Sequence, residues 1–223
     1  MWNVSKAETG LATWTVGSQS IEVDARGGGH GIKLTVQQAA IVSFCPIDED
    51  KLPEACEQYV RGSGWHVNYS QGDSSYALRL SFEPIETTDE RSVMEVCVSI
   101  QTDLLDLHPK LDIEVDCDDI DSVVPHCDFG DDAVRGSGVA PISIAKRSSS
   151  SASILLGPHD HPFTTNHSTD MTLRLRLFGD FLEKGVIRKA RPWIVFDCGK
   201  TADEETVQRT WKELSDSPLP LTP

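Results

Sequence analysis

The chain has 223 residues, with 35 acidic and 20 basic side chains and a formal net charge of −15. This charge argues against general attraction to nucleic acid or to an anionic membrane surface, although it leaves room for a local basic site. No apolar run is long enough to span a bilayer, and the first ten residues contain no apolar signal core. We therefore expect no nucleic-acid partner, no membrane segment, a cytoplasmic location and one domain over residues 1–223.

The N-terminal part of the chain predicts short strands. Apolar and polar residues alternate at 11–16, 20–25 and 32–36, which is the pattern of strands with one buried face. The glycine-rich residues 27–31 predict a turn, not a phosphate-binding loop, because a strand-like segment follows them where a helix would be needed. The continuous apolar run at 39–45 predicts a strand that is buried on both faces.

The middle of the chain predicts one helix and more strands. Residues 53–59 predict a short helix, with Pro53 near its first turn. Strands are expected at 65–69, 76–82 and 93–100. From residue 112 to residue 118, acidic side chains alternate with apolar ones, which favours a strand with a solvated acidic face. A calcium site is the alternative, but the spacing does not fit the EF-hand loop.

The last third predicts a strand at 153–156, a long pair of strands over 171–198, and a helix. Apolar residues alternate from Met171 to Leu177, and Leu182–Gly185 predicts the turn of a hairpin with one apolar and one basic face. Pro192 favours an edge position or a bulge. Residues 203–215 predict a helix with acidic residues in its first turn. The pattern predicts a mainly β fold, a two-sheet antiparallel β-sandwich with a short C-terminal helix.

Cysteine usage favours free thiols. The six cysteines are scattered, and no Cys-x-x-Cys pair occurs among them. In a chain of this length without a secretion signal, we expect all of them to be reduced. They are Cys45, Cys56, Cys97, Cys117, Cys127 and Cys198.

A histidine cluster is the first candidate site. His159 and His161 are two residues apart, so on an extended segment both side chains would project to the same side, and His167 could add a third imidazole. The pair could bind a metal ion, line a ligand pocket or belong to an ordinary surface loop. We expect no metal and no cofactor.

Arginines form the second candidate site. Arg174, Arg176 and Arg188 lie within the predicted hairpin, and Arg79 lies between two leucines of an earlier predicted strand. Guanidinium groups bind carboxylates and phosphates through paired hydrogen bonds, so these residues could bind an acidic sugar. Alternatively, the hairpin arginines pair with the acidic residues 112–121, within the sheet or across a dimer interface.

The segment from Leu155 to Asp197 resembles galactose mutarotase-like sandwich domains. The resemblance rests on the turn Phe-Leu-Glu-Lys-Gly-Val-Ile at 181–187, which leads into a terminal strand, and on histidines in connecting loops. It implies two large antiparallel sheets and a carbohydrate-binding cleft. It also implies a histidine acid and a glutamate base, which in comparable order are His159 or His161 and Glu183.

Two hypotheses about function follow. The first is a carbohydrate- or sugar-acid-recognising, mutarotase-like protein. The second is a scaffold or assembly subunit that pairs through an edge strand near Pro192 and could form a homo-oligomer. Catalysis requires a histidine and a carboxylate in one pocket, recognition requires only the pocket, and assembly requires neither.

Overall fold

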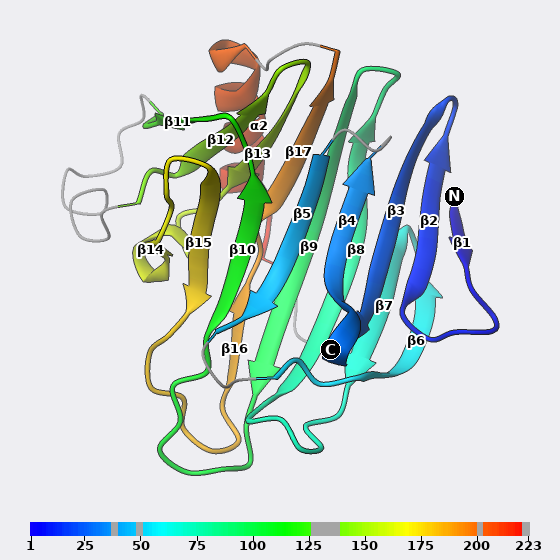
Figure 1. Ribbon diagram of the computed structural model, residues 1–223, viewed down its shortest axis with the longest axis vertical. Coiled ribbons are helices and arrows are strands. Elements are labelled where there is room, and N and C mark those ends of the chain that lie inside the picture. The colour runs from blue at the N-terminus through cyan, green and yellow to red at the C-terminus, as the bar shows by residue number, and fades with distance from the viewer. Residues whose placement is uncertain (37–39, 48–50, 126–138, 200–202, 220–223) are drawn as a thin grey trace.

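The protein is a sandwich of two stacked antiparallel sheets, as the computed structural model in Figure 1 shows. The structure describes residues 1–36, 40–47, 51–125, 139–199 and 203–219. Every strand pair in these ranges is antiparallel, and one α-helix follows the last strand. The predicted mainly β fold, with two sheets and a C-terminal helix, is confirmed.

The first sheet, called sheet A, contains the five N-terminal strands and three later strands that extend it beyond β5. Its described strands lie in the order β1 (Trp2–Val4), β2 (Leu11–Val16), β3 (Gln19–Gly27), β4 (Gly31–Val36), β5 (Ala40–Pro46), β10 (Leu111–Asp116), β15 (Thr172–Phe178) and β14 (Thr165–Asn166). A short 3-10 turn, η1 (Gly28–His30), joins β3 to β4, so the glycine-rich residues form a turn before a strand, as predicted.

The second sheet, called sheet B, contains the middle of the chain and its last strands. Its described strands lie in the order β11 (Asp119–Val123), β12 (Ile142–Arg147), β13 (Ser150–Leu155), β17 (Trp193–Cys198), β9 (Arg91–Gln101), β8 (Ala77–Thr87), β7 (Gly64–Tyr69) and β6 (Ala55–Arg61). A short strand, β16 (Ile187–Ala190), pairs with the second half of β9, beyond the residues that pair with β17.

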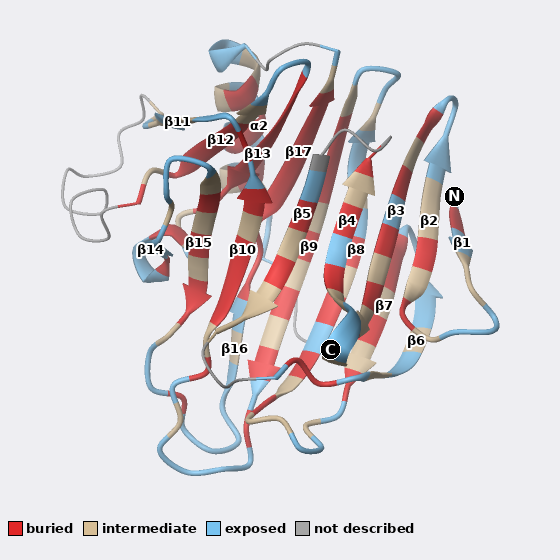
Figure 2. Ribbon diagram, in the orientation of Figure 1, coloured by how far each residue is buried: buried red, intermediate tan, exposed pale blue. Residues whose placement is uncertain are grey.

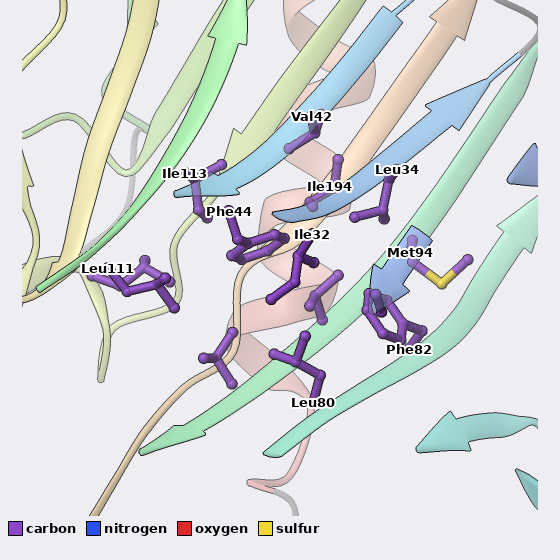
Figure 3. Close-up of a cluster of buried hydrophobic side chains, with 14 of the residues drawn as sticks. Ile32, Leu34, Val42, Phe44, Leu80, Phe82, Met94, Leu111, Ile113 and Ile194 are labelled. Atoms are coloured by element: carbon purple, nitrogen blue, oxygen red, sulfur yellow. The ribbon is translucent and has the colours of Figure 1, made fainter. Parts of the chain in front are cut away.

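The core fills the space between the sheets. Along several strands in Figure 2, such as β3, β4, β8 and β15, buried residues alternate with intermediate or exposed ones, because successive side chains point to opposite faces. Figure 3 shows how side chains of both sheets meet: Phe44 and Ile32 of sheet A lie near Leu80 and Phe82 of sheet B, and all four are at most 1% exposed. This contact between the inner faces is the main apolar burial of the fold.

Two local predictions were wrong. The expected helix at 53–59 is instead the edge strand β6, which pairs with β7 through a bulge between Ala55 and Glu57. The bulge disturbs the period-two pattern that would have marked a strand, and tertiary pairing outweighs the weak helix signal of Pro53. The apolar run at 39–45 forms β5, but it is not buried on both faces, since Ile41 is 46% exposed.

The predicted hairpin over 171–198 was also wrong. Its first strand, β15, pairs with β10 in sheet A, whereas β16 and β17 pair with β9 in sheet B. The segment between them crosses from one sheet to the other. Pro192 separates β16 from β17, which agrees with its inability to donate to a sheet, but β17 lies inside the sheet between β9 and β13. An edge strand directly after Pro192 is therefore excluded.

The C-terminal helix, α2 (Glu204–Asp216), covers part of the outer face of sheet B. Asp203 caps its N-terminus by accepting a hydrogen bond from the Thr206 amide at 2.9 Å, and the helix interval predicted from sequence is confirmed. Val207, Trp211 and Leu214 pack on β12, β13 and β17. The helix does not cover the outer face of β6, β7 and β8.

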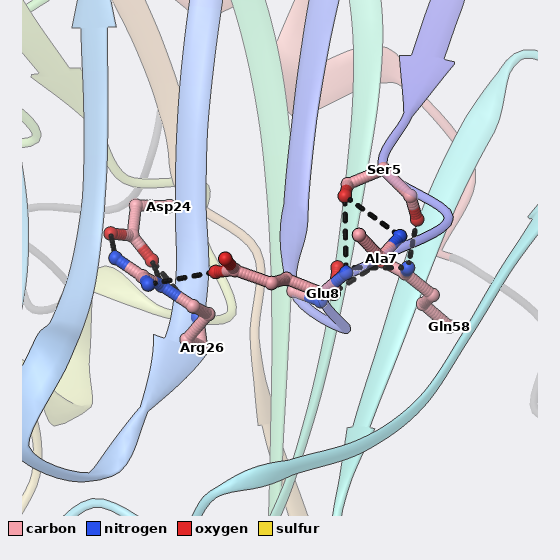
Figure 4. Close-up of polar contacts among 7 residues, drawn as sticks. Ser5, Ala7, Glu8, Asp24, Arg26 and Gln58 are labelled. Carbon is pink, nitrogen blue, oxygen red and sulfur yellow. Dashed lines mark hydrogen bonds and ion pairs between the residues drawn. The ribbon is translucent and has the colours of Figure 1, made fainter.

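Polar contacts join the two sheets at the end formed by β1 and β6. The Gln58 side chain of β6 donates to the Ser5 carbonyl and accepts from the Gly10 amide, both at 2.9 Å (Figure 4). Arg26 binds Asp24 at 2.7 Å and Glu8 at 3.0 Å beside this link (Figure 4). Ion pairs that solvent still reaches contribute little to stability, so the apolar core remains the main source of stability.

The structure also bears on the expected free thiols and on the expected lack of a membrane segment. Cys45, Cys56, Cys97, Cys117 and Cys198 are free thiols, and Cys127 lies outside the described residues. Among the helices that the structure describes, none is long and apolar enough to cross a membrane.

Candidate ligand-binding pocket

A pocket of about 290 Å³ opens between the end of β15 and the strand β16. Its volume is at the lower end of the range for small-molecule sites. Its walls come from the loop after β13, from the 3-10 turn η2 (His161–Phe163) and from both sheets. The residues that line it are His159, Asp160, Phe163, Leu177, Phe178, Asp180, Arg188, Lys189 and Ala190.

Apolar side chains line part of the pocket. Leu177 and Phe178 end β15 in sheet A, and Ala190 ends β16 in sheet B; all three are buried. Phe163 projects from η2 and is 66% exposed. The pocket therefore combines an apolar floor with one aromatic ring open to solvent.

Charged groups surround the same cavity. The Arg188 guanidinium lies 3.5 Å from the Asp180 carboxylate, with 40% and 65% of the two side chains exposed. At this distance and exposure the pair is weak, so its partners can exchange for a ligand at little cost. His159 is exposed and also lines the cavity.

Asp160 is the most constrained polar group of the pocket. Its carboxylate accepts a hydrogen bond from the Arg191 amide at 2.9 Å. Burial raises the pKa of Asp160 above its usual value, and the hydrogen bond and charge of Arg191 oppose that rise only in part. A carboxyl group with a raised pKa beside a histidine is a common feature of functional sites.

The raised pKa of Asp160 predicts a pH effect on stability. A carboxyl that binds its proton more tightly when folded stabilises the fold below its usual pKa of about 3.9 and loses that contribution as the pH rises through the folded pKa. In the wild type, this loss lowers the free energy of unfolding as the pH rises. We expect Asp160→Asn to show a smaller decrease, because an amide does not titrate, while its oxygen still accepts the hydrogen bond from the Arg191 amide. Urea denaturation from pH 4 to pH 7 measures it. Asp180→Asn, at an exposed carboxyl of the same pocket, is the control, and parallel pH profiles for wild type and Asp160→Asn would contradict the expectation.

His161 does not share the pocket with His159. The His161 ring is buried, with Nε2 2.6 Å from the Val139 carbonyl oxygen, so it stabilises the loop. The expected extended segment is wrong, because η2 begins at His161 and turns its ring inward while His159 stays exposed. His167 is exposed and contacts Thr165. No group of three potential metal-ligating side chains occurs among the residues that the structure describes.

Glu183 lies outside the pocket. It is exposed in the turn before β16, and its carbonyl accepts from the Val186 amide. The carboxylates that line the cavity with His159 are Asp160 and Asp180. Sequence reasoning missed both, although Asp160 stands between the two histidines it selected.

Arg174 and Arg176 also lie away from the pocket lining. They pair across β10 and β15, Arg176 with Asp112 at 3.0 Å and Arg174 with Glu114. This matches the interpretation in which the arginines neutralise the acidic segment within the sheet. The expected solvated acidic face is correct for Asp116 and Asp118, which are exposed, but wrong for Asp112, which is fully buried. The expectation that Arg188 belongs to the same hairpin as Arg174 and Arg176 is wrong, since Arg188 lies in sheet B, opposite Ile100.

Arg79 lies on a different surface. It belongs to β8, and its exposed side chain lines a smaller hollow on the outer face of sheet B, which Lys189 also lines. Of the seven residues singled out from the sequence, His159 and Arg188 therefore meet in one pocket, while the other five lie elsewhere.

No family model matches the chain, and no curated protein matches it.

Proposed function

We propose that the pocket between β15 and β16 binds a sugar-sized ligand that carries a carboxylate, such as a uronic acid. The observation that carries this proposal is the convergence of Arg188, His159 and two carboxylates around one 290 Å³ cavity with an apolar floor. The mutarotase-like resemblance of this part of the sequence points to the same class of ligand.

The chemistry of each wall suits such a ligand. A guanidinium group binds a carboxylate through two parallel hydrogen bonds, and Arg188 is held only weakly by Asp180. His159, Asp160 and Asp180 offer acceptors for hydroxyl groups. Phe163 presents an aromatic ring on which the apolar face of a sugar ring can lie.

The same walls would serve a mutarotase-like reaction. Opening a sugar ring requires one group that removes a proton and another that donates one. In this pocket His159 and Asp160 would take these roles in place of the pair with Glu183, because Asp160 has a raised pKa and Glu183 lies outside the cavity. The proposal thus has three parts: the ligand is a carbohydrate, the reaction is mutarotase-like, and the protein acts in the cytoplasm.

A comparison of Arg188→Ala with Lys184→Ala tests the binding. Lys184 is an exposed cation in the turn just before β16 and does not line the pocket. We expect glucuronate and galacturonate to raise the melting temperature of the wild type in a dose-dependent, salt-sensitive way. Arg188→Ala should weaken binding at least about tenfold, as expected for one charge-assisted pair, and Lys184→Ala should bind like the wild type.

The opposite outcomes favour the second hypothesis. If uronates do not shift the melting temperature, or if Arg188→Ala binds them as tightly as the wild type, the pocket is not a sugar-acid site. An assembly role would then have to use another edge than the one after Pro192, since β17 is flanked on both sides. A concentration-dependent dimer in sedimentation experiments would support that role.

A further inference from the structure

A second hollow lies on the outer face of sheet B, on the part that α2 leaves open. Four polar residues stand directly opposite one another on adjacent strands: Asn68 of β7, Arg79 of β8, Ser99 of β9 and Lys189 of β16. Directly paired residues of neighbouring strands point to the same face, with Cβ atoms about 4.5 to 5.5 Å apart. The register therefore forms a continuous row of hydrogen-bond donors across four strands.

Ala77 makes the surface concave beside this row. It lies two residues before Arg79, and thus on the same face, opposite Gln101, which is in turn opposite Ile187. A methyl group among longer side chains leaves a hollow of about 130 Å³, which these residues and the polar row line. This volume corresponds to about four water molecules at ~30 Å³ each, so the hollow suits a group of a few heavy atoms.

The charge of the hollow is positive on an otherwise acidic protein. Arg79 and Lys189 are both exposed and both line it, whereas no acidic residue does. The nearest acidic residue in the same row is Glu57, on the far side of Asn68, and it accepts a hydrogen bond from the Asn68 amide at 2.6 Å. Asn68 thus separates that carboxylate from Arg79.

We propose that this hollow binds a small oxyanion of the size of phosphate, either free or as the terminal group of a small metabolite. Arg79 would supply paired donors, Lys189 a second positive charge and Ser99 a hydroxyl donor. The ligand is a small anion and not a polyanionic polymer, because a net charge of −15 repels nucleic acid. This site is separate from the proposed sugar-acid pocket and shares only Lys189 with it.

Titration of the protein with inorganic phosphate tests the proposal. Isothermal calorimetry at low ionic strength should give saturable binding of one equivalent, which sodium chloride weakens. Arg79→Ala should lower the affinity at least about tenfold. Ala77→Leu should lower it similarly while keeping every charge, because the larger side chain fills the hollow. Arg61→Ala, which removes a cation of the neighbouring edge strand β6 outside the hollow, should bind like the wild type.

Several outcomes would overturn the proposal. It fails if no saturable binding is seen, if Arg79→Ala binds as well as the wild type, or if Arg61→Ala loses as much affinity as Arg79→Ala. Circular dichroism of Ala77→Leu shows whether that variant is folded, and Arg79→Ala provides the test if it is not. Arg188→Ala should bind phosphate normally, so failure of the sugar-acid proposal and failure of this one are distinguishable. A phosphate monoester such as glycerol phosphate then distinguishes a free anion from a terminal group.

Discussion

Replacing Arg191 with methionine should lower the free energy of unfolding by about 3 to 5 kcal/mol, the usual cost of breaking a buried ion pair. Arg191 is only 8% exposed. Its guanidinium donates to the Pro218 carbonyl at 2.7 Å and to the Leu214 and Ser217 carbonyls at 3.4 Å, and it lies 3.6 Å from the Glu95 carboxylate. Methionine keeps most of the apolar stem, so the loss reports the charge and its hydrogen bonds.

The reason for this large effect lies at the C-terminus of α2. The last carbonyl groups of a helix have no partner within the helix and carry partial negative charge. The last turn of α2 contains no basic residue, so Arg191, from the segment between β16 and β17, supplies the missing cation. One side chain thus joins the helix to sheet B and, through its backbone amide, to Asp160 in the pocket.

Two controls sharpen the Arg191 experiment. Lys212→Ala removes an exposed ion pair of the same helix and should change stability by less than about 1 kcal/mol. Burial raises the pKa of Glu95, and the charge of Arg191 opposes that rise. Without Arg191, ionising Glu95 in the folded protein costs more. The stability loss of Arg191→Met should therefore grow from pH 4 to pH 7. A deficit below 0.5 kcal/mol at about pH 7 would show that Arg191 does not hold the helix.

The second large effect is expected in sheet A. Arg176→Ala should cost about 3 to 5 kcal/mol, because it leaves the Asp112 carboxylate buried without its main partner. Asp112 is fully buried, and Arg176 reaches its two oxygens at 3.0 and 3.4 Å. Arg174 is 3.9 Å from the same carboxylate, too far to replace those hydrogen bonds.

Arg174→Ala is the matched control for Arg176→Ala. It lies two residues earlier on the same strand, pairs with Glu114 and has 42% of its side chain exposed, against 19% for Arg176. Its loss should therefore cost at most about 1 kcal/mol. Urea denaturation of both variants measures the difference, and equal costs would contradict the assignment. The double variant Asp112→Ala, Arg176→Ala should recover part of the loss, because the uncompensated charge is then gone.

The sequence by itself determined the fold class, most strands and the helix. The alternation from Met171 to Leu177 depends on residues two positions apart, and it predicts the strand β15 with one buried face. The helix start at Asp203 and the apolar stripe that follows it are equally local patterns, and they predict α2. It also identified His159 and Arg188, which do meet in one pocket. The edge strand β6 escaped because a bulge interrupts its alternation.

Only the tertiary structure decided which strands are neighbours, and with them the sites. Nothing local in residues 171–198 states that β15 joins sheet A while β16 joins sheet B, since a strand satisfies its hydrogen bonds equally well with any partner of suitable register. That choice separates Arg176, which neutralises the buried Asp112, from Arg188, which lines the pocket with Asp180. It also excludes Glu183 in favour of Asp160 and Asp180, because what lines a cavity depends on how distant segments close around it. The same choice aligns Arg79 with Lys189 across the three strands β8, β9 and β16.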